Sequence, residues 1–358
     1  MDTELHLKQV TLTNNMLARK LHDVMENGSI CSPLSITYIT ALIHLAASGN
    51  TEVELTKMME GKLNPLQLLI LSEVFNNDVM KLANAVLINK TIPVRPEYVK
   101  LLEQFAMIDD KVDFSNPALV VKATNDFINV NTNGLIKDVL KPDMVDNDTV
   151  MVLVNTIYFK ALWARAFKLK NTTNAKFNNS INVKMMRQTK MHRYFEDNKV
   201  QVVELAYKNP DYCMGFILPK SGTNVADCST YLNRDSTYSR TSVRVFIPKF
   251  THRRNVDLIP HMQKLGVKDL FECGASNLSG MVTKGGVHVS AMVHEAVVIV
   301  DEVATEAAAT TVAVCQLECA RFKPEPKKFY ADHTFIYYIM YVPSRTLLFV
   351  GEFNGVEN

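Results

Sequence analysis

The chain has 358 residues, of which 47% are hydrophobic and 21% charged, a composition typical of folded globular proteins and not of disordered ones. Its 39 Lys and Arg residues nearly balance 37 Asp and Glu residues, and the net charge of +2 argues against a nucleic-acid partner. No run reaches about 18 consecutive apolar residues, so we expect no membrane span.

The first residues, MDTELHLKQV, carry acidic side chains early and lack the apolar core of a secretory signal. We therefore expect a cytoplasmic protein, with unconventional secretion left open. Residues 16–25 repeat apolar positions at helical spacing and stop at Asn27-Gly28, which predicts a surface helix. Residues 36–47 are mostly apolar and predict a buried helix that begins near Ser32-Pro33.

The later pattern changes from helices to strands. Helical spacing recurs at 66–75, 96–105 and 118–130, with an apolar strand predicted at 83–88. Strands are predicted at 150–159, 202–205, 212–218, 242–247, 287–300 and 335–341. Helices followed by strands without a linker favour an α+β fold and one domain over residues 1–358.

Candidate chemistry is sparse. The basic cluster Arg244, Lys249, His252, Arg253 and Arg254 is interpreted as a solvated face. The six cysteines form no CxxC pair, so we expect free thiols, no metal and no cofactor. There is no GxSxG, GxGxxG or GxxxxGK motif, and His294-Glu295 lacks the second His of a metalloprotease helix. We expect no enzyme, although sequence leaves open a triad assembled in space.

A run of small residues follows the apolar strand that ends near Val300. Residues 301–311 are DEVATEAAATT. Glu-Ala-Ala-Ala favours a short helix, which is one interpretation. The other is a segment that must slide between two packed strands, where bulky or charged inward side chains would block insertion.

This segment resembles the hinge of inhibitory serpins, written EEGTEAAAAT, at the same distance from the C-terminus. Other segments similar to serpin motifs follow the family order over essentially the whole chain. They are 32–35 (SPLS), 48–51 (SGNT), 154–163 (VNTIYFKALW), 203–207 (VELAY), 217–219 (ILP), 247–250 (IPKF), 265–267 (LGV), 277–281 (NLSGM), 294–296 (HEA), 331–335 (ADHTF) and 348–351 (LFVG). The Ala331-Asp332-His333 run and the short stretch between Met59 and Ala83 are similar to intracellular ovalbumin-like and poxvirus serpins, and favour a viral origin.

The resemblance implies a serpin fold, with a helix-rich N-terminal part packed on a large mixed β-sheet and further sheets. It also implies a reactive-centre loop at about 302–326 and a suicide inhibitor that traps a serine or cysteine protease as an acyl-enzyme by inserting that loop. The alternative is a serpin-fold protein without inhibitory activity, acting as a binding module or chaperone. We expect a monomer.

The resemblance assigns residues to the moving parts. Ser32, Ser35, Asn155 and His294 correspond to the shutter under the sheet, and Trp163 and Lys249 to the breach where the loop first inserts. An ion pair between Glu302 and Lys249 is expected. The hinge comprises Glu302, Val303, Ala304, Thr305, Glu306, Ala307, Ala308, Ala309 and Thr310.

The chain also departs from the family pattern. Ala304 replaces the usual Gly, which would slow insertion if that position needs a positive φ. Val303 replaces a charged or polar residue. Thr334 replaces the usual Pro and Glu352 the usual Arg, changes that bear on local strand packing.

Spacing within the family places the scissile bond about fourteen residues from Thr305, at Glu318-Cys319. An acidic residue there suits a granzyme-B-like protease with a basic specificity pocket, and a caspase less well. Arg321-Phe322 is the alternative bond and would attract a trypsin-like protease.

Overall fold

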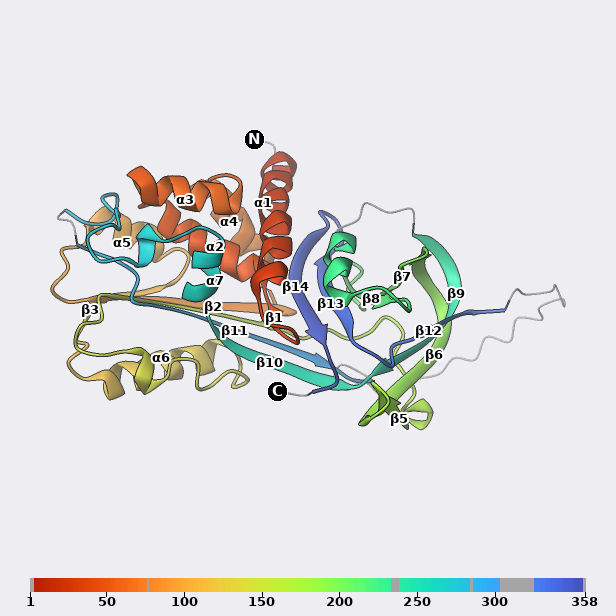
Figure 1. The fold of residues 1–358 in the computed structure, drawn as a ribbon. Helices are drawn as coiled ribbons and strands as arrows, with labels where there is room; N and C mark the ends of the chain where they lie inside the picture. Colours follow the sequence, from red (N-terminus) through yellow and green to blue (C-terminus); the bar gives the residue numbers. More distant parts are fainter. Residues whose placement is uncertain (1–2, 76, 233–237, 284–285, 303–324, 357–358) are drawn as a thin grey trace.

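The computed structural model describes residues 3–75, 77–232, 238–283, 286–302 and 325–356. Figure 1 shows most helices on one side of a long sheet and α6 on the other side. The helices are α1 Thr3–Val24, α2 Pro33–His44, α3 Gly49–Met59, α4 Pro65–Phe75, α5 Pro96–Leu102, α6 Pro117–Asn131 and α7 Ile259–Lys264. None of these described helices is long and apolar enough to cross a membrane.

Helix α2 begins where the sequence predicts. The Ser32 side chain caps it by accepting a hydrogen bond from the Ser35 amide, and Pro33 occupies the first turn, where its missing N–H costs nothing. All twelve residues of α2 are buried, as its apolar composition predicts. The cap therefore fixes Ser32 and Ser35 deep inside the molecule.

The central sheet has the strand order β10-β11-β4-β2-β3. Its middle pair, β4 and β11, runs parallel from Val152 opposite Ala291 to Phe159 opposite Val298, whereas β10 and β2 lie antiparallel outside them. The strands are β10 Phe250–Asp257, β11 Ala291–Val300, β4 Met151–Phe159, β2 Met80–Asn89 and β3 Met107–Val112. Both middle strands are almost wholly buried, as expected where helices cover the two faces of a parallel pair.

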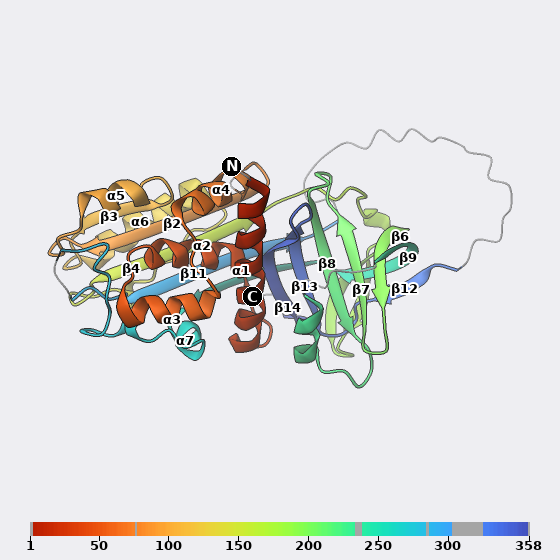
Figure 2. The same ribbon diagram turned by 90° about the horizontal axis from the view of Figure 1, so that it is seen from above.

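The second sheet has the order β1-β14-β13-β8-β7-β6-β9-β12, with β5 paired to β6. Figure 2 shows β13, β8, β7 and β6 side by side. The strands are β1 Ile30–Cys31, β14 Thr346–Phe353, β13 Phe335–Tyr341, β8 Tyr212–Pro219, β7 Val200–Ala206, β6 Ile181–Glu196, β9 Ser239–Pro248, β12 Lys327–Tyr330 and β5 Thr173–Phe177.

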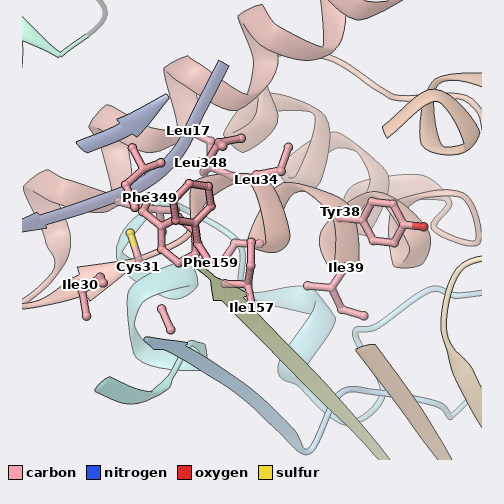
Figure 3. Packing of buried hydrophobic residues seen from close by; sticks show 14 of the residues in the cluster. Leu17, Ile30, Cys31, Leu34, Tyr38, Ile39, Ile157, Phe159, Leu348 and Phe349 are labelled. Atoms are coloured by element: carbon pink, nitrogen blue, oxygen red, sulfur yellow. The ribbon is translucent and has the colours of Figure 1, made fainter. Parts of the chain in front are cut away.

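The two faces of the central sheet belong to separate apolar clusters. Leu153 and Ile157 of β4 pack with α2 in the main core, part of which Figure 3 shows around Phe159, Leu348 and Phe349. Val154 and Tyr158, one residue out of phase, pack with residues of α6. This alternation places Asn155 on the face that carries α2.

Two consecutive tyrosines of β13 each have a glycine as register partner on a neighbouring strand, and each ring covers that glycine. Tyr337 is opposite Gly351 of β14, and Tyr338 is opposite Gly215 of β8. A Cβ atom at either glycine would clash with the ring of its tyrosine. Glycine at these two positions is therefore required by the packing of the rings.

The basic cluster is not simply a solvated face. His252 is buried and bonds the carbonyl of Gly28 and the hydroxyl of Tyr337. Arg253 pairs at 2.5 Å with the buried carboxylate of Glu295. The two residues are consecutive on β10, so their side chains point to opposite faces of the sheet, and each finds a buried partner there.

Candidate functional site

The candidate site follows the end of β11. Of the predicted hinge, Glu302 is described, and residues 303–310 lie outside the described residues. The two candidate scissile bonds, Glu318-Cys319 and Arg321-Phe322, also lie outside them. The structure describes the residues that anchor the start of this segment and the sheet beside it.

Glu302 is held by polar contacts at the start of the segment. Its carboxylate accepts a 2.9 Å ion-pair bond from Lys249 Nζ and a 2.8 Å bond from Thr172 Oγ1, and its carbonyl accepts from the Phe167 amide. The expected ion pair is thus present. Burial favours the neutral acid, but the bonds from Lys249 and Thr172 outweigh burial and lower the pKa of Glu302.

Trp163 holds the preceding residue. Its indole Nε1 donates a 2.8 Å bond to the carbonyl of Asp301, and its ring stacks on Tyr207 at a centroid distance of 4.5 Å. The predicted breach residues therefore hold the start of the predicted loop, Trp163 through Asp301 directly before it and Lys249 through Glu302, its first residue.

The predicted shutter residues form one connected network beneath the centre of the sheet. Asn155 Oδ1 accepts a 2.8 Å bond from Ser35 Oγ and a 2.7 Å bond from His294 Nδ1. The Ser32 amide donates to His294 Nε2 at 3.0 Å, and Ser32 Oγ donates to the carbonyl of Leu348. All four side chains are fully buried. The network joins α2, β4, β11 and β14.

These contacts define the protonation state of His294. Because the Ser32 amide can only donate, Nε2 must accept, so the proton lies on Nδ1 and the ring is neutral. Burial lowers the pKa of His294 to about 3, which agrees with the hydrogen-bond geometry.

The structure adds residues that sequence reasoning missed. Asn84 of β2 lies opposite Asn155, as His294 does on the other side, and its Oδ1 accepts a 2.6 Å bond from Asn155 Nδ2. A single Asn inside the apolar run of β2 was the available signal. The sequence carried no comparable signal for Thr172, because it lies in an Asn- and Thr-rich stretch.

Two departures from the family pattern lie at or within described strands. Thr334 directly precedes β13, and Asn178 Nδ2 lies 3.4 Å from its hydroxyl. Glu352 lies within β14, where its carboxylate accepts a 3.0 Å bond from the Gly28 amide. Neither residue interrupts its strand.

Disulfides and metal-binding clusters are the other features of interest in the part of the chain that the structure describes. Cys31, Cys213, Cys228 and Cys273 are free thiols, as expected. No cluster of three His, Cys, Asp or Glu side chains that could hold a metal ion occurs among the described residues.

Acidification should destabilise the native protein. Burial lowers the pKa of His294 to about 3 and of three further histidines to about 4, namely His44, His192 and His252. In the unfolded chain such groups titrate near about 6.5. Between about pH 6.5 and 4 the unfolded state therefore binds more protons than the native state. As the pH is lowered through this range, the free energy of unfolding decreases by up to about 1.4 kcal/mol per pH unit for each histidine.

The midpoint of thermal unfolding, measured at pH 7.5 and 5.0, checks this expectation. His294→Gln should show a smaller acid-induced loss than the wild type, whereas His261→Gln, a change at a half-buried position of α7, should not. Equal midpoints at both pH values would contradict the prediction.

Comparisons with known proteins identify the family of the chain. The family model described as serpin (serine protease inhibitor) matches residues 9–355. An uncharacterised serpin-like protein of Acanthamoeba polyphaga mimivirus is 34% identical over 97% of this chain and 90% of its own length. Leukocyte elastase inhibitor of Equus caballus is 32% identical over 98% of this chain and all of its own.

Solved structures share the fold. Native protease nexin-1 crystallised with heparin has a TM-score of 0.86 at 24% identity, covering 98% of this chain and 99% of its own. Uncleaved ovalbumin has a TM-score of 0.82 at 23% identity, covering 96% and 98%. The α+β serpin fold expected from the sequence is thereby confirmed, and the match of the family model over nearly the whole length shows that the chain belongs to the serpin family.

Proposed function

We propose that this protein is a suicide-substrate inhibitor, not an enzyme, which traps a protease by inserting its reactive-centre loop between β4 and β11. One observation carries the proposal. The two middle strands are parallel neighbours, and the small-residue segment follows directly after β11. A chain that turns back from the end of β11 would run antiparallel to both strands, and this strand addition is the mode for which serpins are a known example.

The length of the segment fits this movement. Fourteen residues from Thr305 to Glu318 span about 46 Å when extended at about 3.3 Å per residue. The ten residues of β11 span about 33 Å on the same basis. A protease joined to Glu318 would therefore be carried past the far end of the sheet.

The covalent step is an acyl transfer. The nucleophilic oxygen of a serine protease, or the sulfur of a cysteine protease, attacks the carbonyl of the residue before the scissile bond. An ester or thioester forms, and the peptide bond to the next residue breaks with proton transfer to its amine. Inhibition then requires that loop insertion be faster than hydrolysis of this acyl-enzyme.

The shutter geometry supports the route of insertion. His294 and Asn155 are direct register partners on β11 and β4, bonded at 2.7 Å. A new strand between them would separate β4 from β11 by a further strand spacing, about 4.8 Å, and break this bond. The buried network therefore keeps the sheet closed until the loop supplies new partners.

Relatives support a protease as the partner. Leukocyte elastase inhibitor from several mammals is among the similar proteins. The mimivirus relative supports the viral interpretation. We further propose a cytoplasmic monomer whose target is a granzyme-B-like, acid-specific protease, with a trypsin-like protease as the alternative.

The decisive experiment mixes the protein with a panel of acid-specific, trypsin-like and elastase-like proteases. A complex that survives denaturant, with the new C-terminus read by mass spectrometry, would identify the target class and the cleaved bond. Cleavage without any such complex across the panel would favour the serpin-fold protein without inhibitory activity.

The cleaved bond also yields a prediction for single variants. Glu318→Ala should lower complex formation with an acid-specific protease by about a hundredfold or more, because the basic specificity pocket loses its charged partner. Arg321→Ala, the matched control, should leave the rate unchanged. The reverse pattern with a trypsin-like protease would move the scissile bond to Arg321-Phe322.

A further inference from the structure

A cavity of about 580 Å³ opens in the second sheet where β6 separates from β7. The two strands pair only from Arg193 opposite Glu204 to Glu196 opposite Gln201. Before Arg193, β6 pairs with β9 on its other edge and, at residues 181–185, with β5. The side chains of β6 that precede Arg193 therefore have no β7 partner, and the gap is the cavity. Its volume lies within the range of about 300–1,000 Å³ usual for ligand sites.

Three buried polar atoms of residues lining this cavity have no hydrogen-bond partner in the part of the chain that the structure describes, and one of them, Arg193 Nε, still lies within ion-pair distance of Glu204. The other two are Gln188 Oε1 and His192 Nε2, on side chains that are each only 7% exposed. The two residues are four apart on β6 and so lie on the same side of the strand. An unpaired buried polar group costs about 1–3 kcal/mol, so a ligand or water that pairs with these two groups would be stabilised here.

The charge of the cavity is positive. Glu204 is already matched, because Arg193 Nε lies 3.0 Å from one carboxylate oxygen and the Tyr338 hydroxyl donates to the other. Arg165 and Arg240 also line the cavity, and neither has a carboxylate partner among the described residues. Burial, with the nearby charges of Arg240 and Lys190, lowers the pKa of His192 to about 4, so His192 adds no charge at neutral pH.

The remaining wall is apolar. Trp163, Leu205 and Tyr212 line it, and the bond from the Ala164 amide to the carbonyl of Ala206 closes the end next to β7. Trp163 is the single tryptophan of the chain. It is therefore both a surface for an aromatic body and a fluorescent reporter inside the cavity.

We propose that this cavity binds a small organic anion with an aromatic or aliphatic body. Its acidic group lies at Arg240, a hydrogen-bond donor lies at Gln188 Oε1, and its body packs on Trp163. None of the residues that bind the anion belongs to the predicted loop, but Trp163 is shared with the predicted breach, where its indole also bonds the carbonyl of Asp301.

The test uses the full chain and 8-anilinonaphthalene-1-sulfonate, which combines an aromatic body, an N–H donor and a sulfonate. We expect saturable binding at one site with quenching of Trp163 fluorescence by energy transfer to the dye. N-phenyl-1-naphthylamine, which has the same body without the sulfonate, should bind at least about tenfold more weakly.

Variants locate the dye. Arg240→Ala should weaken its binding about tenfold or more, and Gln188→Leu, which keeps the side-chain size, should weaken it severalfold. Arg244→Ala is the matched control, because Arg244 lies on the same face of β9 but does not line this cavity. Absence of quenching, or binding equally strong in wild type, Arg240→Ala and Gln188→Leu, would overturn the proposal and leave a cavity that holds only water.

Discussion

Cleavage of the chain after Thr311 should raise the midpoint of thermal unfolding by at least about 10 °C. Insertion of the free end would complete two ladders of backbone hydrogen bonds, one with β4 and one with β11. It would also bury the small side chains of the hinge between the strands. In domains of 150–250 residues, about 2–4 °C corresponds to about 1 kcal/mol, so the expected gain is several kcal/mol.

The measurement is a thermal melt before and after limited cleavage by a protease that cuts after small residues and is not inhibited. Mass spectrometry must show the cut among residues 303–314, with the rest of the chain intact. An unchanged or lower midpoint would remove the energetic basis of the proposed mechanism and favour a serpin-fold protein without inhibitory activity.

Thr305→Arg should convert the protein from an inhibitor into a substrate. Insertion would have to bury a long charged side chain at the first step, next to strands whose side chains are almost wholly buried. If burial of the Arg side chain raises the barrier to insertion by about 4 kcal/mol, insertion slows on the order of a thousandfold. Hydrolysis of the acyl-enzyme would then be faster than insertion.

The stoichiometry of inhibition against the identified target checks this expectation. Thr305→Val, which keeps the size and branching of the side chain, is the matched control and should still inhibit. The Arg variant should be cleaved at the same bond, and its unfolding midpoint should not rise on cleavage. Covalent complexes at wild-type yield from Thr305→Arg would mean that the hinge register is wrong.

The sequence predicted best those elements whose side chains are uniformly apolar. Strands β4 and β8 lie within one residue of their expected bounds, and helix α2 begins near Ser32-Pro33 as expected but ends three residues before the expected 47, because burial on all sides leaves a clear pattern. Strand β11 begins at Ala291, later than the expected 287, because Val287 and Val289 are buried without joining the strand. Helix α1 begins at Thr3, where Leu5 and Leu12 are exposed and weaken the periodic signal.

The elements that were missed carry charged or exposed side chains. Strand β3 carries Asp109, Asp110 and Lys111, charges that are tolerated only because it is the outermost strand of its sheet. Strand β6 is long and largely exposed before Arg193, so its alternation is masked by Lys and Arg side chains. Helix α3 has only four buried residues, too few to stand out as a stripe.

The residues of the candidate site also fall into those that the sequence assigned and those that it missed. Resemblance to the family assigned Ser32, Ser35, Asn155 and His294, and the structure brings these four together in one network. It could not supply Asn84 or Thr172, because their roles arise from cross-strand register and loop packing, which no local pattern encodes. The hinge after Glu302 remains a prediction from sequence, and so do both candidate scissile bonds.

The paired contacts of Tyr337 with Gly351 and of Tyr338 with Gly215 have a consequence for how this sequence can diverge. Each ring occupies the space that a Cβ atom would fill on the opposite strand. A change of the glycine alone produces a clash, and a change of the tyrosine alone leaves a cavity. Drift at these positions should therefore proceed by coupled substitutions, so that glycine persists in descendants wherever the aromatic ring persists and is replaced only where the ring has been lost.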